Sequence, residues 1–529
     1  MSSRSATPPL SARMGVPRKV LYAACALIGT GLILVGAQLF RIDHIRCTNW
    51  PPLSTGYAYA LAYVTALALL TIGWLGLSDL GAAAAPHPLT PEAARASDSV
   101  AGRSAVSLSF ILLVGIACNV LATLVPPFLA DDGLAYAAVG RALGVYHKDM
   151  FAPLGESLPL TDPLRIAISS NYGWLSVGSA YAPGFNWLAG RIAALAGPDV
   201  ALSLHLFQLC SMAAAVLAAV VAGRAAFLFV LGQPPGAAGS PALHRAAQAA
   251  GNRATALVLL CPLTIIEAAN NAHNDSFLML SVAVFALCVV RGRTLLALGA
   301  LAAALLIKAS ALLLVGLYGV HLLAAAFNFR LPALKRRYVL AALAVAIPLT
   351  VVLVFQLLPW LMRYSSTTAR LLGSPGDEYP YCTRSLECLP RAFLHLVLGM
   401  RTAAWLVGLG FRALAGAFLL FMALRSERGV GHLRYAASFI FFYYLFLHGY
   451  SHPWYVLSLL PLLPYAERRY LPAMLALPLG NLAHYTLDFP YNCDHSVFMV
   501  GLTETLQGLI VLVPSIVLLG KGRPTPAAA

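Results

Sequence analysis

The sequence has few charged residues. Only 10% of its 529 residues are Asp, Glu, Lys or Arg, and 60% are hydrophobic. Soluble globular proteins carry roughly 25% charged residues, so this composition excludes a water-soluble protein. No stretch outside the apolar runs is long enough to bury a core of its own, so we expect one polytopic membrane domain.

The sequence also lacks the signatures of nucleotide and metal binding. It contains no P-loop, no Gly-x-Gly-x-x-Gly after a strand and no metal-site spacing of His, Cys and acidic residues. The net charge of +15 would suggest nucleic acid in a soluble protein, but here the Lys and Arg stand mostly between apolar runs. We therefore expect no metal, no cofactor and no nucleic-acid partner.

The apolar runs predict an all-α integral membrane protein, a bundle of about 14 transmembrane helices, because about 20 residues cross the hydrocarbon core. Basic loops mark the cytoplasmic side, which predicts a multi-pass protein of the plasma membrane with both termini cytoplasmic. Several runs are too short for a full crossing and suggest a vestibule on the outer face. The predicted spans are Val20–Phe40, Tyr57–Leu77, Ser104–Val125, Val200–Ala222, Ala254–Glu267, Ser276–Val290, Thr294–Ile307, Ala309–Phe327, Tyr338–Leu358, Thr402–Leu424, Tyr435–His448, Trp454–Ala466, Tyr470–Tyr485 and Val497–Leu519.

Two outer segments are long, Pro126 to Asp199 and Pro359 to Arg401. In the first, Leu134–Leu143 and Pro183–Leu195 have helical spacing and mixed polarity, which is typical of helices lying along the membrane interface. Four cysteines are expected outside, where they either form two disulfides in one of three connectivities or remain free thiols. They are Cys47, Cys382, Cys388 and Cys493.

Two adjacent acids, Asp131 and Asp132, follow the third predicted span. Neighbouring carboxylates repel each other's charge, which tends to raise one pKa toward the range of a general base. The alternative is that both are ordinary solvated loop acids.

The segment Glu267 to Asp275, with the sequence EAANNAHND, is a second polar cluster between two short predicted spans. Ionisable groups at membrane depth are functional candidates, although a polar turn between helices is the alternative. Lys308 stands alone between two apolar runs. It could offer a fixed positive charge to a lipid phosphate, or it could simply extend its ammonium group to the interface.

A third cluster, His448 to Tyr455, contains two His, two Tyr and one Trp. These side chains supply hydrogen-bond donors and flat aromatic faces suited to a sugar ring, but an aromatic belt at the membrane interface also explains Trp and Tyr. The topology places all these clusters on one face of the membrane. An enzyme that uses a lipid-linked donor where nucleotides are absent would need such a set.

Four segments resemble those of the GT-C superfamily of membrane glycosyltransferases, specifically the polyprenyl-phosphate-mannose-dependent mannosyltransferases of bacterial envelopes. They occur in the family's order between Pro126 and Ala466 and read DDGLAYAAVGR, YAPGFNWLAG, EAANNAHNDSFLML and SHPWYVLSLLPLL. The chain differs from the family's usual plan because two predicted spans precede the helix that leads into the acidic loop. A GT-C-like catalytic module is expected at 104–466, preceded by an N-terminal region of two additional helices at 1–103 and followed by C-terminal helices at 467–529.

The resemblance implies an inverting glycosyltransferase that moves mannose from a polyprenyl-phosphate donor to a hydroxyl of an envelope lipid or glycan on the extracytoplasmic face. Asp132, in an Asp-x-x-x-Tyr spacing with Tyr136, is the first candidate for the general base and Asp131 the second. Lys308, His273 and His452 would steady the leaving phosphate, and Asn270, Asn274 and Asp275 would hold sugar hydroxyls. The other expected substrate-binding residues are Tyr136, Arg141, His448, Trp454 and Tyr455.

Two other functions are considered. A transporter or flippase of a lipid-linked sugar would place ionisable residues near the bilayer midplane, often within inverted repeats, and no repeat is evident. A non-catalytic scaffold of envelope assembly would tolerate replacement of the acids.

Overall fold

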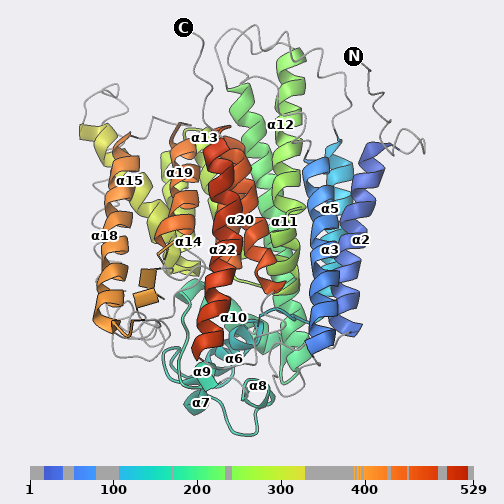
Figure 1. The fold of residues 1–529 in the computed structure, drawn as a ribbon, viewed down its shortest axis with the longest axis vertical. Coiled ribbons are helices and arrows are strands. Elements are labelled where there is room, and N and C mark those ends of the chain that lie inside the picture. Colours follow the sequence, from blue (N-terminus) through green and yellow to red (C-terminus); the bar gives the residue numbers. More distant parts are fainter. Residues whose placement is uncertain are drawn as a thin grey trace.

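In a computed structural model, the described part of the chain is helical, with no strand (Figure 1). The structure describes residues 17–39, 53–78, 106–130, 132–169, 172–232, 241–327, 386–387, 390–391, 393–394, 398–425, 431–448, 452–486 and 497–521. Asp131, the predicted span Tyr338–Leu358 and the four cysteines expected outside fall beyond these residues.

Three helices at the start of the chain form one flank of the bundle (Figure 1). They are α2 (Arg18–Leu39), α3 (Leu53–Leu77) and α5 (Leu108–Thr123). Helices α2 and α3 approach closely at Gly73, which has no Cβ. A Cβ built there would lie only 2.8 Å from the backbone of Tyr22 and of Ala26. The Trp74 indole N–H donates to the Leu257 carbonyl at 3.1 Å, which ties α3 to the middle of the bundle.

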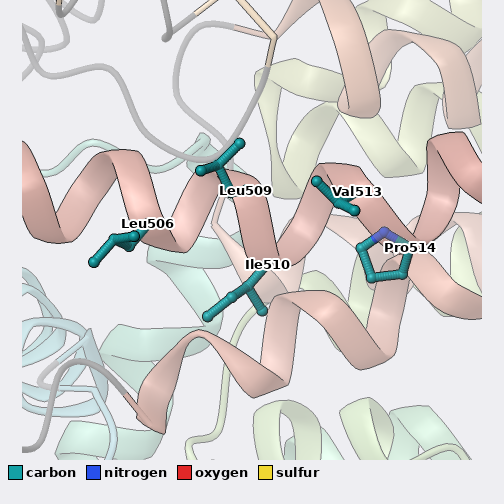
Figure 2. Close-up of a pocket in the computed structure, with 5 residues that line it drawn as sticks. All are labelled: Leu506, Leu509, Ile510, Val513 and Pro514. Carbon is teal, nitrogen blue, oxygen red and sulfur yellow. The ribbon is translucent and has the colours of Figure 1, made fainter.

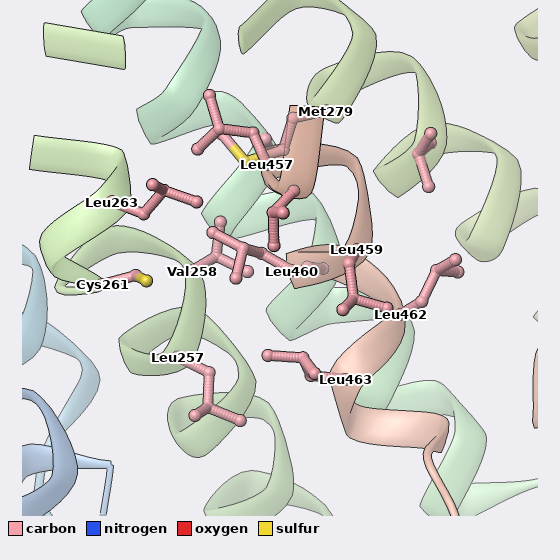
Figure 3. Close-up of a cluster of buried hydrophobic side chains, with 14 of the residues drawn as sticks. Leu257, Val258, Cys261, Leu263, Met279, Leu457, Leu459, Leu460, Leu462 and Leu463 are labelled. Carbon is pink, nitrogen blue, oxygen red and sulfur yellow. The ribbon is translucent and has the colours of Figure 1, made fainter. Parts of the chain in front are cut away.

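The centre of the bundle contains α11 (Val200–Leu231), α12 (Pro241–Leu259), α13 (Asp275–Val290) and α14 (Thr294–Ile307). Leu257, Val258 and Met279 pack there with leucines of the later segment 457–463, all of them at most 2% exposed (Figure 3). Burial of such side chains contributes about 1.5–3 kcal/mol each in water, while in a bilayer close packing carries most of the gain.

Among the later helices, α15, α18 and α19 form the other flank of the bundle, and α20 and α22 lie between the two flanks (Figure 1). Their bounds are η4 Ala309–Ala311, α15 Leu312–Phe327, α18 Arg401–Arg425, α19 Gly431–Phe442, α20 Leu471–Ala483 and α22 Val497–Lys521. On α22 a shallow depression is lined by Leu506, Leu509, Ile510, Val513 and Pro514 (Figure 2). It has no polar side chain and so cannot hold or transform a sugar by itself.

Five helices between α5 and α11 gather at one end of the bundle (Figure 1). They are α6 (Asp132–Gly144), α7 (Leu154–Ser157), α8 (Pro163–Ala167), α9 (Tyr172–Leu175) and α10 (Pro183–Ala196). Tyr136 of α6, Phe185 of α10 and Phe207 of α11 form part of a separate apolar core that these helices share with α11. The helix positions agree with those predicted at Leu134–Leu143 and Pro183–Leu195.

Besides the short 3-10 helix η4, three named helices in the described part of the chain depart from α geometry. η3 (Thr264–Asn270) and η6 (Tyr443–Leu447) are π-helices, and η7 (Pro453–Tyr465) is a 13-residue 3-10 helix with Pro461 and Pro464 inside it. The break between α12 and η3 bends the chain by 59°. Proline cannot donate to a helix ladder, and π-helices are frequent at functional sites. Irregular backbone at membrane depth is tolerated where protein or a cavity encloses it.

Every predicted span within the described residues coincides with a helix, but their bounds and lengths differ. Four helices, α2, α3, α11 and α18, are long and apolar enough to cross a bilayer, and the bent pair α12–η3 would make a fifth. The prediction ended the α11 span at Ala222 and began the next at Ala254. The helices themselves extend further than these spans, because α11 continues to Leu231 and α12 already begins at Pro241.

Candidate functional site

A group of buried polar side chains lies where η3, the start of α13, α6 and η7 meet. Glu267, His273, Asn274 and Asp275 are fully buried, and Tyr136 is 1% exposed. We call Glu267, Asn271, His273, Asn274, Asp275, Tyr136 and Lys308 the polar centre. Burying this many polar groups is costly unless they are hydrogen-bonded or paired, so their partners define the arrangement.

The turn between η3 and α13 has an unusual backbone. Ala272 adopts φ +61°, in the left-handed region that favours glycine. The backbone N–H of Asn271 donates to the Ile266 carbonyl at 2.8 Å, and the backbone N–H of His273 donates to the Glu267 backbone carbonyl at 2.9 Å. These two bonds close the turn. A non-glycine residue there costs about 1–2 kcal/mol, and such strain tends to occur where side chains must be held in one arrangement.

Glu267 is surrounded by three polar partners. Its Oε1 accepts a hydrogen bond from the Tyr485 hydroxyl, and its Oε2 accepts one from the side-chain amide of Asn271, each at 2.9 Å. The His273 Nε2 lies 3.2 Å from the same Oε2. A buried carboxylate with this many partners is held in one orientation.

His273 connects this carboxylate to α6. Its Nδ1 lies 3.3 Å from the hydroxyl of Tyr136, which also lies 3.5 Å from the Asn274 side-chain oxygen. The imidazole stacks on Trp454 with ring centroids 3.8 Å apart, and His452 stacks on Trp454 at 4.2 Å. The indole therefore lies within 4.2 Å of a histidine on each side of it.

Lys308, at the junction of α14 and η4, supplies a cation. Its Nζ lies 2.7 Å from Asp275 Oδ2 and 3.9 Å from the centroid of the Tyr455 ring. Its side chain is 12% exposed, whereas that of Asp275 is 1% exposed. The ammonium group thus combines an ion pair with a cation–π contact, and it is the more accessible member of the pair.

Asp132 begins α6 at the edge of the polar centre and is half-buried. Its Oδ1 accepts a hydrogen bond from the Tyr181 hydroxyl at 2.9 Å, and its charge acts on Lys308. Tyr181 packs edge-on against Tyr136, with ring centroids 4.8 Å apart. Burial and the nearby Asp132 carboxylate raise the pKa of both tyrosines well above the ordinary value, so both hydroxyls stay protonated and able to donate.

Two predicted substrate-binding residues are engaged with the protein itself. The side-chain amide of Asn270 donates hydrogen bonds to the carbonyls of Ala122 and Val125 at 3.0 and 3.1 Å, which connects η3 to the end of α5. Arg141 donates to Asp162 and to the carbonyl of Gly197. Although burial acts to raise the pKa of Asp162, its hydrogen bonds from Arg141 and Tyr146 lower it.

His448 lies at the end of η6, at the margin of the same aromatic group. Its Nδ1 is 3.2 Å from the Tyr443 hydroxyl, and its ring centroid is 5.4 Å from that of Tyr455. The structure thus brings together Asp132, Tyr136, His273, Asn274, Asp275, Lys308, His452, Trp454 and Tyr455, with His448 beside them.

The described residues contain no group of three or more His, Cys, Asp or Glu side chains that could hold a metal ion. Instead they supply a half-buried carboxylate, a partly accessible ammonium and aromatic faces. This is a set suited to a reaction that moves a proton and stabilises a developing negative charge.

Comparison with known proteins decides the family. A protein-family model described as "Alpha-(1->6)-mannopyranosyltransferase, N-terminal domain", of the MptA_B family, matches residues 14–326, more than half of the 529-residue chain. The chain belongs to this family. The resemblance to membrane mannosyltransferases of the GT-C type is thereby confirmed, and so is the expectation of a glycosyltransferase. No curated protein and no solved structure matches the chain.

Two side chains at the site of this mannosyltransferase were missed as site residues in the sequence. Glu267 was seen as part of the polar segment, but its distance of four residues from Asn271 and six from His273 did not show that it would contact both side chains. Tyr181 was noticed only as part of YAPGFNWLAG, yet it donates to Asp132 across 49 residues of chain. The only signals for these two residues in the sequence were the position of Glu267 within an apolar run and the position of Tyr181 directly before Ala-Pro.

Proposed function

We propose that this mannosyltransferase uses a polyprenyl-phosphate mannose donor and transfers the sugar to a hydroxyl of an envelope lipid or glycan on the extracytoplasmic face. The observation that carries the proposal is the placement of Asp132. It is a half-buried carboxylate at the edge of an otherwise enclosed polar centre, and its charge acts on the cation Lys308. A base and a phosphate-binding cation are the two groups that such a transfer requires.

In the proposed step, the Asp132 carboxylate accepts the proton of the acceptor hydroxyl while that oxygen attacks C1 of the mannose. The new C1–O bond forms as the bond from C1 to the phosphate oxygen breaks, and polyprenyl phosphate leaves. Attack opposite to the leaving group inverts C1, so a β-linked donor yields an α-linked product, in agreement with the α-linkage in the family description.

Lys308 is the proposed partner of the leaving phosphate. Its ammonium is bound to Asp275 and rests on Tyr455, so it is held in place before the negative charge develops. Preorganised charge of this kind stabilises a transition state without reorganisation. His452 would pack against the sugar, since its imidazole is partly exposed and aromatic faces pack against the apolar side of a pyranose ring, while Trp454, stacked on it, would hold it in place.

The decisive experiment measures transfer of radiolabelled mannose from polyprenyl-phosphate mannose in membranes that contain wild type, Asp132→Asn or Asp131→Asn. Loss of a general base lowers rates by about 100–10,000-fold, and we expect that loss for Asp132→Asn. Asp149→Asn is the matched control, because Asp149 is an exposed acid in the same loop region, and we expect it to retain transfer.

Each outcome has a defined meaning when the amount of inserted, folded protein is equal. Absence of transfer in wild type with every polyprenyl-phosphate sugar would overturn the donor assignment and favour transport of a lipid-linked sugar. Survival of transfer in Asp132→Asn with loss in Asp131→Asn would move the base to the neighbouring residue. Survival in both would exclude the acid pair as the base.

A further inference from the structure

A continuous series of contacts leads from a fully buried carboxylate to Asp132. It begins at Glu267, passes to His273 Nε2 at 3.2 Å, and continues from His273 Nδ1 to the Tyr136 hydroxyl at 3.3 Å. The Tyr136 ring then packs edge-on against Tyr181, whose hydroxyl donates to Asp132 at 2.9 Å. Three separate parts of the chain contribute to the series, so local geometry alone does not explain it.

The far end of the series is firmly anchored. Besides His273, Glu267 is bound by Asn271 and by Tyr485, so its carboxylate has little freedom to turn. His273 is additionally held flat against Trp454. The Glu267 carboxylate lies against Nε2 of His273, although this nitrogen makes no hydrogen bond with any described residue, so the carboxylate limits the position of the imidazole by close contact while Trp454 fixes its plane. With Nε2 toward the carboxylate, Nδ1 is left facing the Tyr136 hydroxyl.

Tyr136 transmits this orientation by packing. Its ring contacts both Tyr181 and Phe185 edge-on, at 4.8 and 4.9 Å. A displacement of the Tyr136 hydroxyl would move the ring and with it Tyr181, because closely packed aromatic side chains cannot shift independently. Tyr181 donates a hydrogen bond to the Asp132 carboxylate, so a shift of Tyr181 would change the orientation of that carboxylate.

We infer that Glu267 is a positioning residue for the transfer reaction, which acts through His273, Tyr136 and Tyr181 to hold the Asp132 carboxylate toward the acceptor hydroxyl. This inference deepens the proposed function and rests on Asp132 as the base. Glu267 itself does not touch substrate, since its side chain is fully buried. A misplacement of about 1 Å at a reacting group costs up to about 100-fold in rate, so loss of the carboxylate should be felt strongly.

The first test is a kinetic double-mutant cycle with Glu267→Gln and Tyr136→Phe. We expect each single variant to lower kcat by about 10–100-fold while KM changes by less than about threefold. Because both residues act on Asp132 through one series, the double variant should lose no more than the worse single variant. Glu467→Gln, an exposed Glu-to-Gln change in the turn after η7, is the matched control and should keep wild-type kinetics.

Strictly multiplicative losses in the double variant would overturn the inference, and so would a Glu267→Gln variant with wild-type kcat. A purely structural role for Glu267 predicts a different pattern, in which the folded fraction falls while the kcat per folded molecule is unchanged. Thermal unfolding in detergent measures that fraction.

A second measurement separates failure of this inference from failure of the proposed function. The rate at which a hydrophobic carbodiimide modifies Asp132, followed by mass spectrometry, needs no turnover. Carbodiimides react with protonated carboxyl groups, and the Tyr181 hydrogen bond favours the ionised form. Several-fold faster modification in Glu267→Gln than in Glu467→Gln would support the series even if the donor assignment fails. Equal rates in the two variants would refute it.

Discussion

The N-terminal pair α2–α3 and the polar centre are both built from helices, but their helices differ in regularity. α2 and α3 are regular helices without acidic residues in their first turns, and they meet through glycine. The polar centre includes the end of a bent span with the π-helix η3 and a strained Ala272 in the turn, and the π-helix η6 and the long 3-10 helix η7 supply the aromatic residues beside it. Regular helix suffices where only packing is needed, and departures from it occur where side chains must point at one another.

The largest expected effect concerns the ion pair of the polar centre. Lys308→Met would leave Asp275 buried without its cation, which costs about 3–5 kcal/mol, and would abolish mannose transfer. In the double variant Lys308→Met/Asp275→Asn, much of the stability should return because no unpaired charge remains, while transfer should stay absent. Thermal unfolding in detergent and radiolabelled transfer measure the two quantities. Recovery of transfer in the double variant would contradict the role of Lys308.

The α2–α3 pair should respond in the opposite way. Gly73→Val would force the two helices apart, because even a Cβ there lies 2.8 Å from backbone atoms of α2. Overpacking of this kind costs about 1–3 kcal/mol. We expect a lower unfolding temperature with unchanged kcat per folded molecule. A specific loss of kcat would show that this pair is coupled to the reaction.

Two buried tryptophans sharpen the comparison further. Trp74→Phe removes a hydrogen bond to Leu257 and should cost about 1 kcal/mol of stability without a kinetic effect. Trp454→Phe should cost a similar amount of stability, but it loosens the stack between His273 and His452 and should lower kcat/KM by up to about tenfold. Equal kinetic behaviour of the two variants would remove the functional distinction between the regions.

The smallest expected effect is at an exposed ion pair. Arg469 lies 2.7 Å from Glu467, with side chains 49% and 32% exposed. Arg469→Gln should change stability by about 0–1 kcal/mol, because exposed pairs are solvated whether or not they meet. Thermal unfolding at low and high salt would reveal any larger contribution. A loss comparable to that of Lys308→Met would contradict the importance of burial.

The helices could be predicted from the sequence with good accuracy. Thr294–Ile307 agrees with α14 at both ends, and the two expected outer-loop helices lie where periodicity placed them. The bent span was less predictable, since nothing in the apolar run around Ala254–Glu267 marks a change from α to π geometry. Hydropathy reports where a segment is apolar, and it does not report how backbone hydrogen bonds are paired.

The candidate site could be predicted only in part. Asp132, Lys308 and the His273 segment were all identified by their polarity within apolar surroundings. Their roles relative to one another were not, because Asn270 and Arg141 have the same chemistry as a substrate-binding residue yet bind the protein's own carbonyl groups. Whether an amide or guanidinium is engaged depends on its neighbours in space.

The sequence by itself determined that this is a helical membrane protein, where most of its helices lie and which polar residues interrupt them, because these properties depend on composition and period along one segment. The tertiary structure decided which of those polar residues meet. Glu267, His273, Tyr136, Tyr181 and Asp132 come from three segments, and their alignment depends on how α6, η3 and the segment before α10 pack. Contacts between distant segments are set by packing of whole helices, which no local pattern encodes.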